Sequence, residues 1–180
     1  MPILKVNLPT ALTLSRIVLI PVFVLTVYNH PVIGALIFSI ASITDFLDGY
    51  LARRSGQITK FGIIMDPLAD KFLVISALIV LVDMERLSAL IAIILIVREF
   101  LVTALRVVAL SKDIVIPAET GGKLKTAAQI TAIICLILVG SIFDQFPFDL
   151  YAAGIAFIWI ALILAVVSGV QYTVSFWKKI

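Results

Sequence analysis

Residues 45–70 read DFLDGYLARRSGQITKFGIIMDPLAD, and they hold four of the eleven acidic residues of the chain. Long apolar runs lie on both sides of this stretch. Carboxylates beside hydrocarbon are costly unless a partner compensates for their charge. Arginine and lysine side chains within the stretch can supply part of that compensation. A cluster of four carboxylates more naturally indicates divalent cations.

The spacing of these aspartates predicts that they gather on two helices. Asp45 and Asp48 are three residues apart and Asp66 and Asp70 are four apart, so each pair shares one face of a helix. Two antiparallel helices joined by a short loop would bring all four together at one membrane surface. Oxygen ligands in this number suit Mg²⁺ or Mn²⁺ rather than zinc. The competing interpretation is a set of solvated helix-end carboxylates held by Arg and Lys. Four aspartates at these spacings, with Gly49 inside the cluster, favour the metal site.

The composition predicts an all-α, polytopic membrane protein that forms one domain over residues 1–180. The chain is 62% hydrophobic and 14% charged, and its mean hydropathy is +1.20. The net charge of +3 gives no indication of nucleic acid binding. Cys135 is the single cysteine, which excludes an internal disulfide framework. His30 lies in an Asn-His-Pro turn and is expected to be an exposed loop residue, and no cleavable signal peptide is expected.

Six apolar runs, each near the roughly 20 residues that a bilayer core requires, predict six transmembrane helices. Residues 1–8 are mildly amphipathic and predict a short interfacial segment. The first run opens at residues 7–10 and extends to about Tyr28. The others span about 32–53, 66–82, 87–110, 123–143 and 150–176, with polar connections at 54–65, 83–86, 111–122 and 143–149.

The positive charges predict the orientation. With six spans, both termini share one side with the 54–65 and 111–122 connections, and the opposite turns receive only Arg86 as a basic residue. By the positive-inside rule, the termini and the aspartates face the cytosol and the chain is integral to the cytoplasmic membrane. The basic residues on that side are Lys5, Arg53, Arg54, Lys60, Lys71, Lys112, Lys123, Lys125, Lys178 and Lys179.

A second group of charges lies in and after the fourth run. Arg98 and Arg106 are eight residues apart, about 80° around a helix, so they line one broad face. Together with Lys123 and Lys125 they predict a basic pocket that binds an anion such as a phosphate, although the lysines also fit ordinary positive-inside flanking. Glu99 is expected to tie helices together or to orient an arginine. A local Arg98–Glu99 pair is not expected, because adjacent helical residues do not face each other.

The acidic stretch resembles the signature of the CDP-alcohol phosphotransferases. These integral membrane enzymes transfer a substituted phosphate from a CDP-alcohol to an acceptor hydroxyl and release CMP. The match has eight fixed positions within 26 residues and no gap, which makes it highly specific: Asp45-x2-Asp48-Gly49-x2-Ala52-Arg53-x8-Gly62-x3-Asp66-x3-Asp70.

Further motifs resemble the branch of that family that makes phosphatidylglycerophosphate. This resemblance covers about residues 7–130 and implies CDP-diacylglycerol as donor, sn-glycerol 3-phosphate as acceptor, and a homodimer. An inositol phosphate would also need a basic pocket and stays open as the acceptor. The motifs are Asn7-Leu8-Pro9-Thr10-x-Leu12-Thr13-x2-Arg16, Arg98-Glu99-Phe100 with Arg106, and Gly122-Lys123-x-Lys125-Thr126-x2-Gln129.

The resemblance also implies roles for single residues. The four aspartates ligate two Mg²⁺ or Mn²⁺ ions, and Asp70 is in addition the general base on the acceptor hydroxyl. Gly49 lets the backbone approach the nucleotide without a Cβ clash. The implied nucleotide and CDP-diacylglycerol site consists of Asn7, Thr10, Gly49, Ala52, Arg53 and Thr59. The implied acceptor-phosphate site consists of Arg98, Arg106, Lys123 and Lys125.

Two other classes of protein compete with this interpretation. A cation-coupled anion transporter would use the carboxylates for cations and the arginines for an anion, but it predicts inverted repeats and helices broken at the membrane midplane. The sequence contains no visible internal repeat. A structural membrane subunit would not need four clustered aspartates.

Overall fold

The computed structural model describes residues 8–55, 60–111, 121–145 and 147–178, with side chains described in 18–44, 71–109, 124–143 and 147–178. Within these residues the chain is all-helical, which confirms the all-α part of the predicted fold class. The elements are α1 (Leu8–Val27), α2 (Pro31–Ser55), α3 (Lys60–Asp83), α4 (Ala89–Ser111), α5 (Gly121–Leu138), the short 3-10 helix η1 (Ile142–Gln145) and α6 (Leu150–Trp177).

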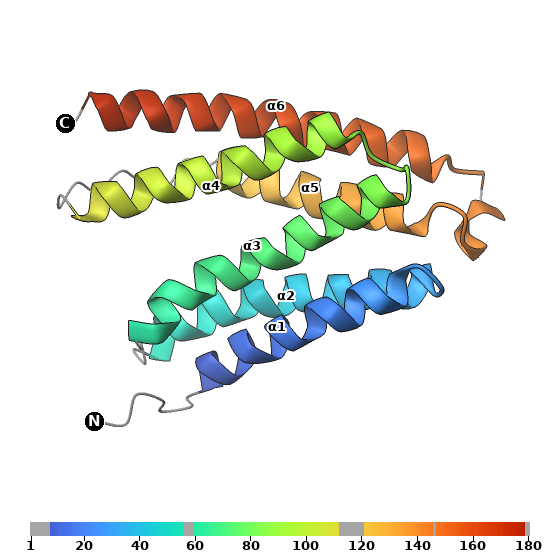
Figure 1. Ribbon diagram of the computed structural model, residues 1–180, viewed down its shortest axis with the longest axis horizontal. Coiled ribbons are helices and arrows are strands. Elements are labelled where there is room, and N and C mark those ends of the chain that lie inside the picture. Colours follow the sequence, from blue (N-terminus) through green and yellow to red (C-terminus); the bar gives the residue numbers. More distant parts are fainter. Residues whose placement is uncertain (1–7, 56–59, 112–120, 146, 179–180) are drawn as a thin grey trace.

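The helices form an elongated bundle, with α1, α2 and α3 on one side and α4, α5 and α6 on the other (Figure 1). Successive helices run in opposite directions. The start of α1, the end of α6 and the facing ends of α2 and α3 therefore share one end of the bundle, as the sequence predicts. α5 packs along α6, α1 packs on α2 and α3, and α2 contacts α5. This contact, together with the contacts of α3 with α4 and α5, joins the two halves.

Two predicted boundaries are wrong. α3 begins at Lys60 rather than near residue 66, because hydropathy detects only the apolar part of a helix and not a polar first turn. α5 ends at Leu138 rather than near residue 143. Gly140 has a φ of 75°, a left-handed conformation that commonly ends helices, and η1 follows it.

The core consists of large apolar side chains contributed by all six long helices. The rings of Phe23 on α1 and Phe38 on α2 lie 5.8 Å apart at their centroids and are tilted by 44°, an arrangement that aromatic pairs favour. The largest fully buried side chains are Phe23, Val27, Phe38, Leu78, Leu81, Leu95, Ile133, Leu136, Ile137 and Ile158.

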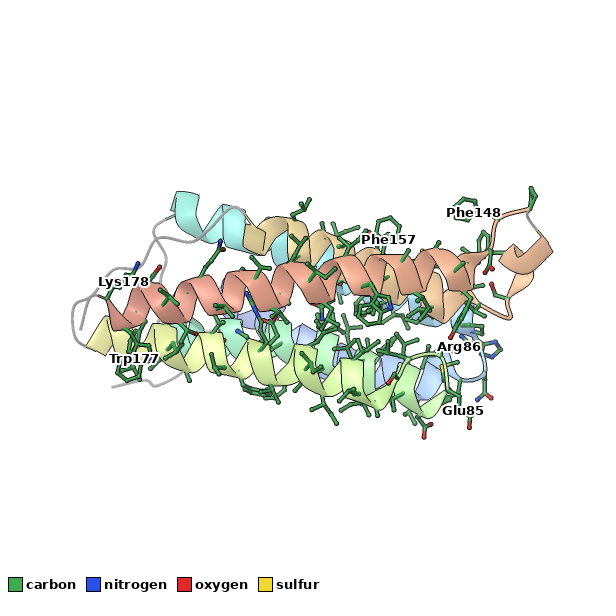
Figure 2. All side chains as sticks on the ribbon, turned by 90° about the horizontal axis from the view of Figure 1, so that it is seen from above. Glu85, Arg86, Phe148, Phe157, Trp177 and Lys178 are labelled. Carbon is green, nitrogen blue, oxygen red and sulfur yellow. The ribbon has the colours of Figure 1, made fainter. Side chains whose placement is uncertain are left out.

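The outer faces of the helices are also apolar. Leu25 on α1 is 76% exposed, and Leu90 on α4 and Ile163 on α6 are likewise exposed. Water-soluble monomers rarely expose apolar surface on this scale. Within the described residues, α6 alone is both long and apolar enough to cross a membrane. Polar labelled residues lie toward the ends of the bundle, with Glu85 and Arg86 at one end and Lys178 at the other (Figure 2).

The connections between α1 and α2 and between α3 and α4 meet at the end of the bundle remote from the aspartates. The hydroxyl of Tyr28 donates to Oδ2 of Asp83 over 2.8 Å. This hydrogen bond, with a smaller effect of desolvation, raises the pKa of Tyr28 above its usual value. His30 lies between α1 and α2 and is exposed, which confirms its prediction as a loop residue.

Arg86, after α3, holds the last turn of α5. Its Nη1 donates to the carbonyls of Leu136 at 3.1 Å and Ile137 at 2.9 Å. Both carbonyls are in the last turn of α5, where a helix has no N–H groups of its own to pair with them. Replacing Arg86 by Met should therefore destabilise the protein by about 1.5–3 kcal/mol. Thermal unfolding in detergent measures the effect. Glu85→Gln, a change at the exposed neighbouring residue, should leave the unfolding midpoint unchanged. An Arg86→Met midpoint equal to that of the wild type would contradict the proposed role.

Candidate functional site

The four aspartates lie on the two helices predicted for them. Asp45 and Asp48 are in the second half of α2, and Asp66 and Asp70 are in the first half of α3. α2 ends at Ser55 and α3 begins at Lys60, so both segments lie at the same end of the bundle (Figure 1). The carboxylates themselves are outside the described side chains, and their gathering stays a prediction. Among the side chains that are described, no three of His, Cys, Asp and Glu come together.

The predicted nucleotide site also falls largely outside the described part of the chain. Asn7 and Thr59 lie outside the described residues. Thr10 is helical in α1, and Gly49, Ala52 and Arg53 are helical in α2, but their side chains are not among those described. The same is true of Lys123 in the first turn of α5.

A cavity of about 250 Å³ lies among α2, α3, α4 and α5. Lys71, one of its lining residues, directly follows Asp70 in α3, so the cavity begins beside the acidic stretch. Its polar lining residues are Ser42, Lys71, Glu99, Lys125, Thr126 and Gln129. Its apolar lining residues are Leu73, Val74, Ile75, Leu78, Ile96 and Ile130.

Lys125 and Glu99 form an ion pair in the wall of this cavity. Lys125 is only 4% exposed, and its ammonium contacts Oε1 of Glu99, which joins α5 to α4. Nη1 of Arg98 donates to the same carboxylate oxygen at 3.2 Å. Of the two roles predicted for Glu99, the one that ties helices together is confirmed. The expectation that Arg98 and Glu99 would not pair locally is wrong, because the long arginine side chain brings its guanidinium back to the carboxylate of its neighbour.

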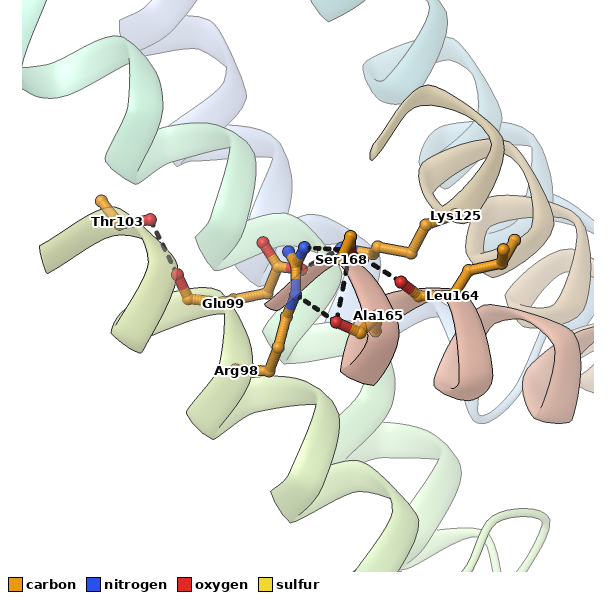
Figure 3. A network of polar contacts seen from close by, with 7 residues as sticks. All are labelled: Arg98, Glu99, Thr103, Lys125, Leu164, Ala165 and Ser168. Carbon is orange, nitrogen blue, oxygen red and sulfur yellow. Dashed lines mark hydrogen bonds and ion pairs between the residues drawn. The ribbon is translucent and has the colours of Figure 1, made fainter. Parts of the chain in front are cut away.

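Arg98 is itself held by α6, as Figure 3 shows. Its Nε donates to the carbonyl of Ala165 at 2.9 Å, and its Nη2 donates to Oγ of Ser168 at 2.7 Å. The Ser168 hydroxyl donates to the carbonyl of Leu164 at 2.7 Å. The stem of Arg98 passes over Gly169, where an added Cβ would lie 3.3 Å from Cγ of Arg98. A continuous chain of polar contacts thus runs from α6 through Arg98 and Glu99 to Lys125.

The remaining predicted acceptor residue with a described side chain lies farther along α4. Arg106 is exposed, and its guanidinium carbon is 6.0 Å from the centroid of the Tyr172 ring on α6, at the outer limit of a cation–π contact. Of the predicted set, Lys125 therefore lines the cavity, Arg98 of α4 contacts Glu99 and is held by α6, and Arg106 lies over Tyr172.

The cavity wall also contains residues that the sequence does not predict as site residues, among them Lys71 and Gln129. The sequence predicts Lys71 only as a positive charge on the cytosolic side, although its position next to Asp70 is a signal for a site residue. Gln129 is 3% exposed. Within the described structure, its Nε2 has no hydrogen-bond partner. The signal for Gln129 is its spacing of four residues from Lys125, which puts both on one face of α5.

The match to a family profile identifies the class of protein. The chain belongs to the CDP-alcohol phosphatidyltransferase family, whose profile matches residues 6–167. This is a family of membrane-embedded enzymes that generally depend on divalent cations.

The chain is similar to several bacterial relatives over nearly its whole length. It is 41% identical to the CDP-diacylglycerol–glycerol-3-phosphate 3-phosphatidyltransferase of Bacillus subtilis (strain 168), with 97% of each chain covered. It is 39% identical to the protein of the same name from Rickettsia bellii, covering 92% of this chain and 93% of the relative. The Haemophilus influenzae protein of that name is also 39% identical, with 94% of this chain and 92% of the relative covered.

Proposed function

We propose that the protein transfers the phosphatidyl group of CDP-diacylglycerol to the free hydroxyl of sn-glycerol 3-phosphate, giving phosphatidylglycerophosphate and CMP. The observation that carries this proposal is the cavity beside the acidic stretch, with Lys71 and Lys125 in its wall. The names of the similar bacterial enzymes support it.

The size and charge of the cavity favour a small anionic acceptor. Pockets for drug-sized ligands measure about 300–1,000 Å³, whereas this cavity of about 250 Å³ suits a smaller molecule than CDP-diacylglycerol. Two lysines and one glutamate line it, and that glutamate is already paired with Lys125 and Arg98. A phosphate monoester accepts charge-assisted hydrogen bonds from such ammonium groups. Uncharged glycerol has no anionic group to offer them.

The four aspartates would hold two Mg²⁺ or Mn²⁺ ions. Their donor set fits these metals, because it consists of carboxylate oxygens and α2 and α3 each contribute two at helical spacing. When bound, the ions would neutralise the pyrophosphate of the donor and polarise the phosphorus under attack.

The residues of the chain then divide the work of transfer. Asp70 accepts the proton of the acceptor hydroxyl. At the same time the hydroxyl oxygen forms a bond to the phosphatidyl phosphorus, and the bond from that phosphorus to CMP breaks. Lys125 holds the acceptor's phosphate, with Arg106 and Lys123 as further proposed partners, while Arg98 acts through Glu99. The residues proposed to hold the donor nucleotide are Asn7, Thr10, Gly49, Ala52, Arg53 and Thr59.

The proposal includes one membrane domain that crosses the cytoplasmic membrane six times, with both termini and the aspartates in the cytosol. The apolar outer faces of the helices and the asymmetric distribution of Lys and Arg support this arrangement. A homodimer is proposed from the family resemblance alone.

An acceptor screen tests the proposed reaction. Protein in detergent is given CDP-diacylglycerol and Mg²⁺ or Mn²⁺ with radiolabelled glycerol 3-phosphate, inositol 1-phosphate, serine or glycerol, and CMP release is measured. Glycerol 3-phosphate should be the preferred acceptor, and EDTA should remove activity. A preference for inositol 1-phosphate would be consistent with a cavity that binds a phosphate, but it would overturn glycerol 3-phosphate as the acceptor. Preference for serine or glycerol would overturn the charge argument, and turnover that withstands EDTA would overturn the metal site.

A further inference from the structure

Gln129 is an enclosed amide in the wall of the cavity. It lies one helical turn after Lys125 on the same face of α5, and the two side chains line the same space. Only 3% of Gln129 is exposed. Its Nε2, which carries two N–H donors, has no hydrogen-bond partner within the described part of the chain.

A donor of this kind calls for a physical explanation. Native structures keep few buried polar groups without a partner, because desolvating a donor is unfavourable unless a hydrogen bond replaces the water that it loses. A leucine or methionine at this position would fill the same space without that cost. The glutamine is therefore best explained by a molecule that enters the cavity and accepts its hydrogen bond.

The neighbours of Gln129 define the chemistry of that molecule. The ammonium groups of Lys71 and Lys125 only donate hydrogen bonds. The carboxylate of Glu99 already accepts from both Lys125 and Arg98. The donors among these side chains match a group that is all acceptor, such as a phosphate, while an ammonium group finds no acceptor in Gln129 Nε2.

We propose that Gln129 contacts the acceptor substrate, donating from Nε2 to an oxygen of its phosphate, and that it contributes to the choice of a phosphate monoester as acceptor. This inference rests on the proposed function, because it assigns a residue to the acceptor of that reaction. Gln129 and Lys125 thus recognise the same group from adjacent turns of α5.

The test compares variants of this residue in the same CMP-release assay. Gln129→Leu removes the donor and should raise the KM for glycerol 3-phosphate roughly tenfold, while the KM for CDP-diacylglycerol changes little. Gln129→Glu is nearly isosteric, but its carboxylate repels the phosphate, so the KM for glycerol 3-phosphate should rise further. Gln171→Leu, the matched change at an exposed glutamine of α6, should leave both constants unchanged.

Binding of glycerol 3-phosphate, measured by calorimetry, provides a second readout that does not depend on turnover. A structural role of Gln129 would change the thermal unfolding midpoint and leave the KM for glycerol 3-phosphate alone, and that result would overturn the inference. Unchanged KM values in folded Gln129→Leu and Gln129→Glu would also overturn it. Should the leucine variant fail to fold, the glutamate variant decides. Wild-type protein that does not use glycerol 3-phosphate would instead overturn the proposed function.

Discussion

Replacing Asp70 by Asn should reduce turnover by roughly 10²–10⁴-fold, the range expected when a general base is lost. The amide keeps the size of the side chain but cannot accept the proton of the attacking hydroxyl. The folded protein should still bind CDP-diacylglycerol. The measurements are CMP release and incorporation of radiolabelled glycerol 3-phosphate, together with binding of the donor lipid.

Asp149 provides the matched control for this substitution. Its Oδ1 accepts from the backbone N–H of Ala152 at 2.9 Å and caps the start of α6 at the opposite end of the bundle. Because asparagine caps helices about as well as aspartate, Asp149→Asn should keep both stability and turnover. Normal turnover of Asp70→Asn, or an equal loss in both variants, would contradict the role assigned to Asp70.

Replacing Lys125 by Met should raise the KM for glycerol 3-phosphate by roughly a hundredfold. Removing one partner of a buried, hydrogen-bonded charge pair commonly has an effect of this size, because the other charge is left without it. Here both the bound phosphate and the Glu99 carboxylate lose their contact with Lys125, while Glu99 keeps its contact with Arg98. The KM for CDP-diacylglycerol should change little. Steady-state kinetics with each substrate varied in turn measure both constants.

Lys178→Met is the control for the loss of a lysine charge, because Lys178 is exposed at the end of α6 and is not among the residues that line the cavity. It should leave both KM values unchanged. Thermal unfolding separates a loss of substrate binding from a loss of folded protein. A folded Lys125→Met variant with an unchanged KM for glycerol 3-phosphate would refute the assignment of Lys125 to the acceptor.

The sequence by itself determined the helical class and the helices that carry the aspartates. Both conclusions rest on local properties, namely the hydrophobic runs and the spacings of Asp45 with Asp48 and of Asp66 with Asp70. Residues at these spacings share one face of a helix wherever that helix packs. The ends of the helices were less predictable. The end of α5 depends on the left-handed backbone of Gly140, and the start of α3 at Lys60 leaves no trace in the hydropathy.

Only the tertiary structure decided which charged residues meet. Arg98 and Ser168 are 70 residues apart, and their contact exists because α4 packs on α6 with Gly169 leaving room for the arginine stem. The sequence predicts a basic pocket that includes Arg98, and the fold adds that its guanidinium contacts Glu99, which is also paired with Lys125. Gln129 likewise becomes a candidate substrate residue only because four helices enclose it beside a cavity. Such contacts depend on the relative placement of distant helices, which no local pattern specifies.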